Sequence, residues 1–444
     1  MKGATGVVTI IGGGLAGSEA AFYAAKNGLK TVVYEMKPEK FSPAHTLSTL
    51  GELVCSNSLK SEGRENASGL LKEEMRLLGS IILEAADATR VPAGNSLAVD
   101  RGAFSSFITG RLEEMGVEII RQDVSELPGD RPLVIATGPL TTGGLAARLQ
   151  ALIGKKNLFF YDAVSPVVYG DSIDMDRAFF GSRYNKGGDD YINCPLNEDE
   201  YGVFVKELLG ARAVLPHDFE STPLFEGCMP IEAMAGRGPK TLMFGPLRPV
   251  GLIDPRTGKR PFAVVQLRME NSAGTLYNMV GFQTKLAFSE QARVFRMIPA
   301  LENAEFARYG KLHRNTYMDS PGVISRTLQL RKERGLFFAG QITGVEGYCE
   351  SAVAGIVAGM NAVRFCRGRE PVAPPPSTMT GALLEHISTS TGGAFQPMNA
   401  NFGLLPQGEK KPGGRRKRRL DQADSALEAM KAWQNEILEN LPLI

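Results

Sequence analysis

The chain has 444 residues, of which 43% are hydrophobic and 22% are charged. This length is too great for one simple domain, and the composition excludes a disordered or fibrous protein. The 50 basic residues nearly balance the 48 acidic ones, giving a formal net charge of +2, so any attraction to nucleic acid must come from local clusters.

The first elements in chain order predict a strand–helix–strand unit. Residues 7–11 (VVTII) are mostly β-branched and indicate a strand, and the small and apolar residues that follow recur at helical spacing until Gly28. Residues 31–35 (TVVYE) indicate the second strand. The unit therefore has the βαβ pattern of a nucleotide-binding domain.

A glycine-rich turn of the GxGxxG type joins the first strand to the helix. Such glycines permit a tight turn and close approach of a pyrophosphate, while the helix N-terminus offers free N–H groups. A carboxylate at the end of the second strand suits a ribose hydroxyl. The predicted dinucleotide site comprises Gly12, Gly13, Gly14, Leu15, Ala16, Gly17 and Glu35. The alternative is a turn that serves tight packing alone.

The next segments continue the α/β pattern. Residues 66–79 and 102–116 have the periodicity of amphipathic helices, and residues 117–124 (VEIIRQDV) and 132–138 (PLVIATG) predict strands. From about residue 161 the pattern changes to runs interrupted by proline and glycine. We expect the runs 240–252, 260–269 and 276–284 to form an antiparallel sheet.

Residues 335–366 return to strand, loop and a long helix rich in small residues, so the second domain is predicted to be an insertion in the first. Two strand ends, VIATGP and FFAGQITGVEG, consist of small residues, as needed where the backbone crosses an extended FAD, and the helix after the second could stabilise a reduced flavin. They add Ala136, Thr137, Gly138, Gly340, Gln341 and Gly347 to the predicted cofactor site. No second GxGxxG follows a strand, which disfavours a two-nucleotide disulfide reductase. The predicted fold class is α/β, a Rossmann-like FAD-binding domain of the glutathione-reductase type with an inserted mixed, largely antiparallel β domain.

Beyond a proline-rich linker (371–377), residues 410–419 (KKPGGRRKRR) carry seven positive charges, and residues 420–441 predict a helix. The five cysteines are odd in number and form no zinc-type spacing, so we expect reduced thiols and no metal site. No leader pattern and no run of 18 apolar residues is found. These features predict a cytoplasmic protein.

Several long segments, in the same order, resemble the TrmFO family, the folate- and FAD-dependent tRNA uracil-5-methyltransferases. They include residues 12–21 (GGGLAGSEAA), 55–76 (CSNSLKSEGRENASGLLKEEMR), 225–238 (FEGCMPIEAMAGRG) and 340–362 (GQITGVEGYCESAVAGIVAGMNA). The resemblance runs from residue 7 to about 405. The related GidA family has TTGY where this chain has VEGY, and a long helical C-terminal domain for which we expect no room here. Minor departures from TrmFO are Leu247–Arg248, where Met–Lys is usual, and Cys349, where an aliphatic residue is usual.

The resemblance implies methylation of uracil C5 in the T-loop of tRNA, with 5,10-methylenetetrahydrofolate as carbon donor. Reduced FAD would supply the hydride, and NAD(P)H would reduce FAD again. Three alternatives stay open: a paralogue that acts on ribosomal RNA, a plain NAD(P)H:FAD oxidoreductase, and an RNA-binding flavoprotein without this activity. The oligomeric state is not predicted.

The same resemblance implies roles for two cysteines. A thiolate that adds to C6 makes uracil C5 nucleophilic, and Cys228 matches the family cysteine given this role. Cys55 matches the cysteine expected at the flavin face, where it would react or shape the pocket. We expect Cys194, Cys349 and Cys366 to be packing residues.

The resemblance also places His313, Arg314, Asn315 and Tyr317 near flavin or folate, with a structural hydrogen-bonding role as the alternative. RNA phosphates are expected at the basic tail, unless that tail is merely solvated, or at six residues of the inserted domain. These six are Arg237, Lys240, Arg248, Arg256, Lys259 and Arg260. The predicted divisions are 1–160 and 321–405 for the FAD-binding domain, 161–320 for an inserted substrate and folate domain, and 406–444 for the tail and its helix.

Overall fold

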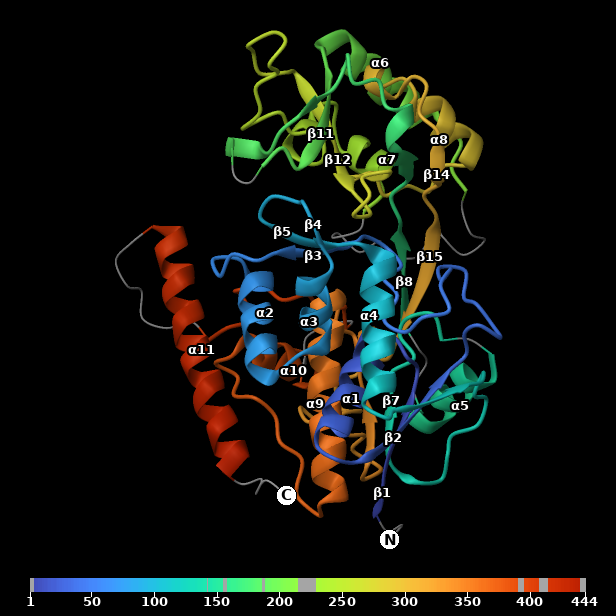
Figure 1. Cartoon of the computed structure of the whole chain (residues 1–444), viewed down its shortest axis with the longest axis vertical. Coiled ribbons are helices and arrows are strands. Elements are labelled where there is room, and N and C mark those ends of the chain that lie inside the picture. Colours follow the sequence, from blue (N-terminus) through green and yellow to red (C-terminus); the bar gives the residue numbers. More distant parts are fainter. Residues whose placement is uncertain are drawn as a thin grey trace.

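The computed structural model describes residues 4–141, 143–154, 158–185, 188–214, 229–389, 395–406 and 414–439. A parallel sheet with its helices forms the lower part in Figure 1, and an antiparallel sheet with shorter helices forms the upper part. The antiparallel pair β8 (Leu158–Ala163) and β15 (Leu312–Tyr317) runs between them. The predicted fold class, α/β with an inserted and largely antiparallel sheet, is confirmed.

The five-stranded parallel sheet contains all the strands expected for the first domain. In spatial order they are β16 (Leu336–Phe338), β7 (Arg131–Ile135), β1 (Ala4–Ile11), β2 (Lys30–Glu35) and β6 (Glu118–Arg121). β16 lies some two hundred residues after β7 in the chain, and it pairs with β7 in parallel, Leu336 opposite Leu133. The chain therefore returns to its first sheet, as the sequence predicts.

Two helices of small residues pack closely beside this sheet, α1 (Leu15–Lys26) and α9 (Tyr348–Cys366). A Cβ atom added to Gly355 would lie 2.2 Å from the carbonyl oxygen of Ala16, and one on Gly359 would lie 2.7 Å from the Cα of Ala20. Both distances are below van der Waals contact. The small residues of these helices thus allow the two backbones to approach, which fixes the first turn of α1.

The other helices of the lower part are α2 (Ala67–Leu78), α3 (Ile81–Ala88), α4 (Arg101–Glu114), α5 (Gly143–Ile153), α10 (Met379–Thr389) and α11 (Arg415–Glu439). A small antiparallel sheet, β3 (Ser58–Ser61), β5 (Ser96–Val99) and β4 (Arg90–Val91), lies where the two parts meet (Figure 1). The predicted helices 66–79 and 102–116 are confirmed as α2 and α4. Among the residues that the structure describes, no helix is long and apolar enough to cross a bilayer.

The upper sheet has six strands, and all its pairings are antiparallel. In spatial order they are β10 (Phe179–Phe180), β11 (Tyr191–Leu196), β12 (Ala263–Met269), β13 (Leu276–Met279), β9 (Val167–Tyr169) and β14 (Phe306–Arg308). Helices α6 (Glu198–Gly210), α7 (Ile231–Ala235) and α8 (Phe288–Phe295) bury Phe204, Ile231 and Phe295 in its core. Strands are confirmed within the runs 260–269 and 276–284, while residues 260–262 and 280–284 lie outside them.

Two local predictions are wrong. The run 240–252 forms a 3₁₀ turn at Thr241–Phe244 and then loop, with no strand. Pro246 and Pro249 lack the N–H group that a central strand must donate, which favours this outcome. The C-terminal helix begins at Arg415 and not at residue 420, so the last basic residues belong to its first turns.

Candidate active site

A groove opens where β1, β2 and β7 end and α1 begins. It has a volume of about 1150 Å³, which includes its open mouth. Ten of the residues predicted for the cofactor line it: Gly12, Gly14, Leu15, Ala16, Glu35, Ala136, Thr137, Gly138, Gly340 and Gln341. This size and position are typical of ligand clefts at the carboxyl ends of parallel strands.

The glycines of the turn have different physical roles. Gly12 has a φ of +101°, and a Cβ there would lie 2.5 Å from the carbonyl oxygen of Ala136; a Cβ on Gly17 would lie 1.8 Å from the carbonyl oxygen of Gly12. These two glycines are required by the packing of the chain itself. Gly14 differs, because it has an ordinary φ of −72° and no atom lies within 4 Å of its Cβ position. Its missing side chain keeps part of the groove wall open.

Three residues predicted for the cofactor do not line the groove. Gly13 donates its N–H to Oε2 of Glu35 at 2.9 Å, Gly17 packs inside the turn, and Gly347 precedes α9, where a Cβ would lie 2.2 Å from a carboxylate oxygen of Glu350. Glu35 also accepts the N–H of Lys37 at 3.0 Å. Two N–H groups therefore hold its carboxylate at the groove wall.

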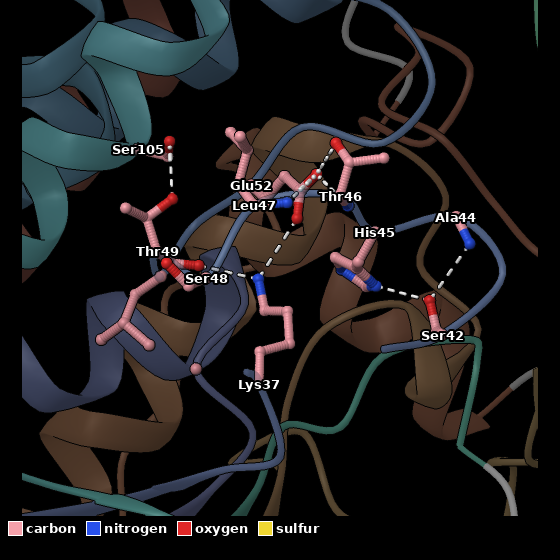
Figure 2. Close-up of polar contacts among 12 residues, drawn as sticks. Lys37, Ser42, Ala44, His45, Thr46, Leu47, Ser48, Thr49, Glu52 and Ser105 are labelled. Atoms are coloured by element: carbon pink, nitrogen blue, oxygen red, sulfur yellow. Dashed lines mark hydrogen bonds and ion pairs between the residues drawn. The ribbon is translucent and has the colours of Figure 1, made fainter. Parts of the chain in front are cut away.

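One wall of the groove contains a buried ion pair that the sequence did not reveal. Lys37 lies 3.3 Å from Oε2 of Glu52, and their side chains are only 4% and 2% exposed. Figure 2 shows the pair at the centre of the loop: Lys37 also donates to the carbonyl of Thr49 at 2.7 Å, and Glu52 accepts the N–H groups of Thr46 and Leu47 at 2.8 and 3.2 Å. The pair thus holds the loop that forms this wall.

His45 lines the groove beside this pair. Its Nδ1 lies 2.6 Å from the hydroxyl oxygen of Ser42 (Figure 2). Burial lowers the pKa of His45, and the neighbouring Lys37 ammonium lowers it further. His45 is therefore neutral at pH 7 and hydrogen-bonds without adding charge to the groove. Lys37, His45 and Glu52 lie on an irregular loop. No helical or strand periodicity of the sequence therefore indicates that they lie close together.

We expect Lys37→Met to destabilise the protein by about 3–5 kcal/mol, because it leaves the Glu52 carboxylate buried without a counter-charge. Urea unfolding of the full chain measures the effect. The double variant Lys37→Met/Glu52→Gln should recover part of the loss, since the amide oxygen still accepts from Thr46 and Leu47. Lys30→Met is the matched control: its pair with Glu118 is 65% and 52% exposed, so the loss should stay below about 1 kcal/mol. Equal losses for the two lysines would contradict this assignment.

Cys55 is half-buried and lies next to the groove. The hydroxyl oxygen of Tyr348, the first residue of α9, accepts the N–H groups of Cys55 and Ser56 at 2.8 and 3.1 Å. Val54 and Tyr348 both line the groove. The structure therefore brings Cys55 to the edge of the predicted cofactor site, although Cys55 and Tyr348 are far apart in the sequence.

A group of charged side chains surrounds the backbone of Cys55 at the junction of the two sheets. Arg101 and Arg308 each direct a guanidinium nitrogen to the carbonyl oxygen of Cys55 at 3.4 Å. Arg101 forms an ion pair with Glu270, which Arg308 approaches to 3.7 Å. Arg268 donates to the side-chain oxygens of Ser56 and Asn57 at 2.7 and 3.0 Å.

The other cysteines that the structure describes differ from Cys55 in their surroundings. Cys228 lies outside the described residues. Cys194 is buried in the upper sheet and Cys349 at the start of α9, and burial raises the pKa of these thiols to about 12 and about 11. Cys366 is half-buried, and burial raises its pKa as well. Protonated, enclosed thiols of this kind are packing groups.

The segment 312–317 forms strand β15. Asn315 and Tyr317 are buried, and the Tyr317 hydroxyl donates to the carbonyl of Phe395 at 3.3 Å. The side chains of His313 and Arg314 lie outside the described residues. Neither Asn315 nor Tyr317 lines the groove. The hydrogen bond of Tyr317 to Phe395 therefore fits the structural alternative.

The fold and groove can be compared with known proteins. The model of the family "Glucose inhibited division protein A" matches residues 7–370. A methylenetetrahydrofolate–tRNA-(uracil-5-)-methyltransferase TrmFO of Geobacter sulfurreducens is 57% identical over 96% of this chain and 98% of its own, and one of Moorella thermoacetica is 56% identical over 95% and 97%. The chain belongs to the TrmFO family. A solved GidA structure of Aquifex aeolicus has a TM-score of 0.71 at 19% identity, with 97% of this chain and 73% of that chain covered, so it shares the fold.

In this TrmFO-family chain, the basic tail lies partly against its own protein. Arg416 lies 3.2 Å from the carboxylate of Glu65, and Arg419 stacks over the ring of Phe402 at 5.4 Å. The buried residues of α11, among them Met430 and Trp433, join the lower core. The later turns of α11 are therefore packed against the lower part, while the basic residues Arg415, Arg416, Lys417 and Arg418 in its first turn are exposed.

The basic residues expected in the inserted domain are exposed. They are Arg237, Lys240, Arg248, Arg256, Lys259 and Arg260. Arg256 pairs with Asp254 at 2.7 Å, so its charge is partly compensated.

Proposed function

We propose that this chain transfers a one-carbon unit from methylenetetrahydrofolate to C5 of a uracil in tRNA. The observation that carries the proposal is the identity of 57% over 96% of the chain to a TrmFO protein named for this reaction. The compared stretch spans nearly the whole chain, so it includes both the lower and the upper part.

FAD is the resident cofactor in this proposal, and the residues present fit it. Gly14 leaves space in the groove wall, the N-terminus of α1 supplies free N–H groups for a pyrophosphate, and Glu35 holds a carboxylate where a ribose would lie. Ala136, Thr137 and Gly138, with Gly340 and Gln341, would form the opposite side. A methylene group is one oxidation level above methyl, and FAD in its reduced form supplies the missing hydride equivalent.

The chain's own groups activate the uracil. We assign to Cys228 the thiolate that adds to C6 and makes C5 nucleophilic, and to Cys55 a position at the groove edge. The target base is stacked within folded RNA, so it has to be turned out to reach a thiol. We also propose the T-loop as the target, NAD(P)H as the reductant that restores the cofactor, the exposed basic residues as contacts to phosphate, and the cytoplasm as the compartment.

The test is an assay with purified full chain, methylenetetrahydrofolate, NADPH and unmodified tRNA, in which 5-methyluridine is measured by mass spectrometry of digested RNA. We expect product that depends on all three substrates. Product with ribosomal RNA alone would change the substrate, and the absence of product with both RNAs would refute the methyltransferase.

A further inference from the structure

The side chains around Cys55 form a buried cluster with an excess of positive charge. Within the described residues, the charged and titratable groups around Cys55 are Arg101 on α4, Arg268 on β12, Glu270 just after it, Arg308 on β14 and Tyr348 on α9. Arg101 and Arg308 contact the backbone carbonyl of Cys55, which places their charges close to its side chain. Three guanidinium groups thus face one carboxylate. Arginine stays protonated in proteins, so the imbalance is not removed by proton loss.

The hydrogen bonds of the cluster are incomplete in the described part of the chain. The Nε atoms of Arg101 and Arg308 and Oε2 of Glu270 are buried without a hydrogen-bond partner there. Glu270 is 7% exposed, so water compensates little of the charge. Burial lowers the pKa of Arg268 and Arg308, which shows that the surrounding negative charge does not fully offset their desolvation. Such a site favours an additional anion.

Tyr348 is not that anion. Burial raises the pKa of its phenol, and its oxygen accepts two backbone N–H groups while it remains a neutral hydroxyl. Among the described residues of the cluster, the other titratable group is the thiol of Cys55, and a negative charge on it favours the charged form of all three arginines.

We propose that Arg101, Arg268 and Arg308 are positioning residues that hold Cys55 as a thiolate in the resting protein. The thiol proton passes to solvent, and the negative charge on sulfur offsets one of the two excess positive charges. Arg101 comes from helix α4 of the lower part, and Arg268 and Arg308 come from β12 and β14 of the upper sheet. The thiolate site therefore forms only when the two parts of the protein are docked. The proposal concerns the same site as the proposed function, but its test needs neither folate nor RNA, so the two can fail separately.

The test is the pH dependence of iodoacetamide alkylation of the Cys55 peptide, followed by mass spectrometry on the purified full chain. An ordinary cysteine has a pKa of about 8.5, and cationic surroundings lower it to about 3.5–7.5. We expect the midpoint for Cys55 to lie below about 7.5. A midpoint of about 8.5 or higher would overturn the proposal.

Three variants separate this electrostatic role from a structural one. Arg308→Gln should raise the midpoint by about one pH unit, which reduces alkylation at neutral pH by up to about tenfold. Arg308→Lys should keep it close to the original value, and Glu270→Gln should lower it. Arg293→Gln on α8, an exposed pair with Glu207 and Glu290, loses the same charge far from the thiol and should change nothing. A merely structural role predicts no opposite shifts for Arg308→Gln and Glu270→Gln, so unchanged midpoints in both would refute the proposal.

A second measurement does not depend on how easily iodoacetamide reaches the thiol of Cys55. The difference in thiolate ultraviolet absorbance between the full chain and Cys55→Ser, titrated from acid to neutral pH, reports ionisation without a reagent. We expect a step below about pH 7.5 in the difference. Its absence in a folded pair of proteins would overturn the proposal in the same way.

Discussion

Gly14→Val should yield a folded protein that is purified without flavin and has no methyltransferase activity. The φ of −72° at this position suits valine, and no atom lies within 4 Å of the Cβ position, so the chain itself accepts the side chain. The added methyl groups instead enter the groove at the N-terminus of α1, where a pyrophosphate would need the backbone N–H groups. Flavin absorbance per mole of protein measures the loss.

Gly202→Val is the matched control for this experiment. Gly202 lies on α6 of the upper part, and again no atom lies within 4 Å of its Cβ position. It tests the general cost of a valine at an open glycine, and it should keep its flavin. Far-ultraviolet circular dichroism should show native helix content for both variants. Full flavin content in folded Gly14→Val would contradict the placement of the cofactor at this turn.

Cys228→Ala should abolish formation of 5-methyluridine while flavin stays bound. Without a thiolate to add to C6, uracil C5 stays a poor nucleophile, and no other step of the proposed reaction replaces that activation. The groove is built from other parts of the chain, so its cofactor should be retained. The methylation assay and the flavin spectrum of the same preparation measure the two outcomes.

Two further measurements make this prediction specific. The variant should still oxidise NAD(P)H, because that step needs only the cofactor. Cys366→Ala, at the C-terminal end of α9, removes another thiol outside the groove and should methylate tRNA as the original protein does. Turnover of Cys228→Ala close to that of the original protein would remove the thiol from the mechanism.

The residue pattern was sufficient for most of the lower part. β-Branched runs gave β1, β2 and β7, and the GxGxxG spacing gave a turn that does lie at a groove. These predictions depend on neighbours within a few residues, where periodicity and glycine geometry act directly. The strand predicted for the run 240–252 does not form, for an equally local reason: Pro246 and Pro249 lack the N–H group that a strand would donate.

The sequence by itself thus determined the strands of the parallel sheet, the two helices rich in small residues and the glycine-rich turn. Only the tertiary structure decided which polar groups meet: Lys37 with Glu52 in the groove wall, the basic tail with Glu65, and three arginines from α4 and the upper sheet around Cys55. Buried charges of this kind gain their energy from partners far away in the chain, which no periodic pattern records. Their positions are set by how the two sheets dock, and so they appear only in three dimensions.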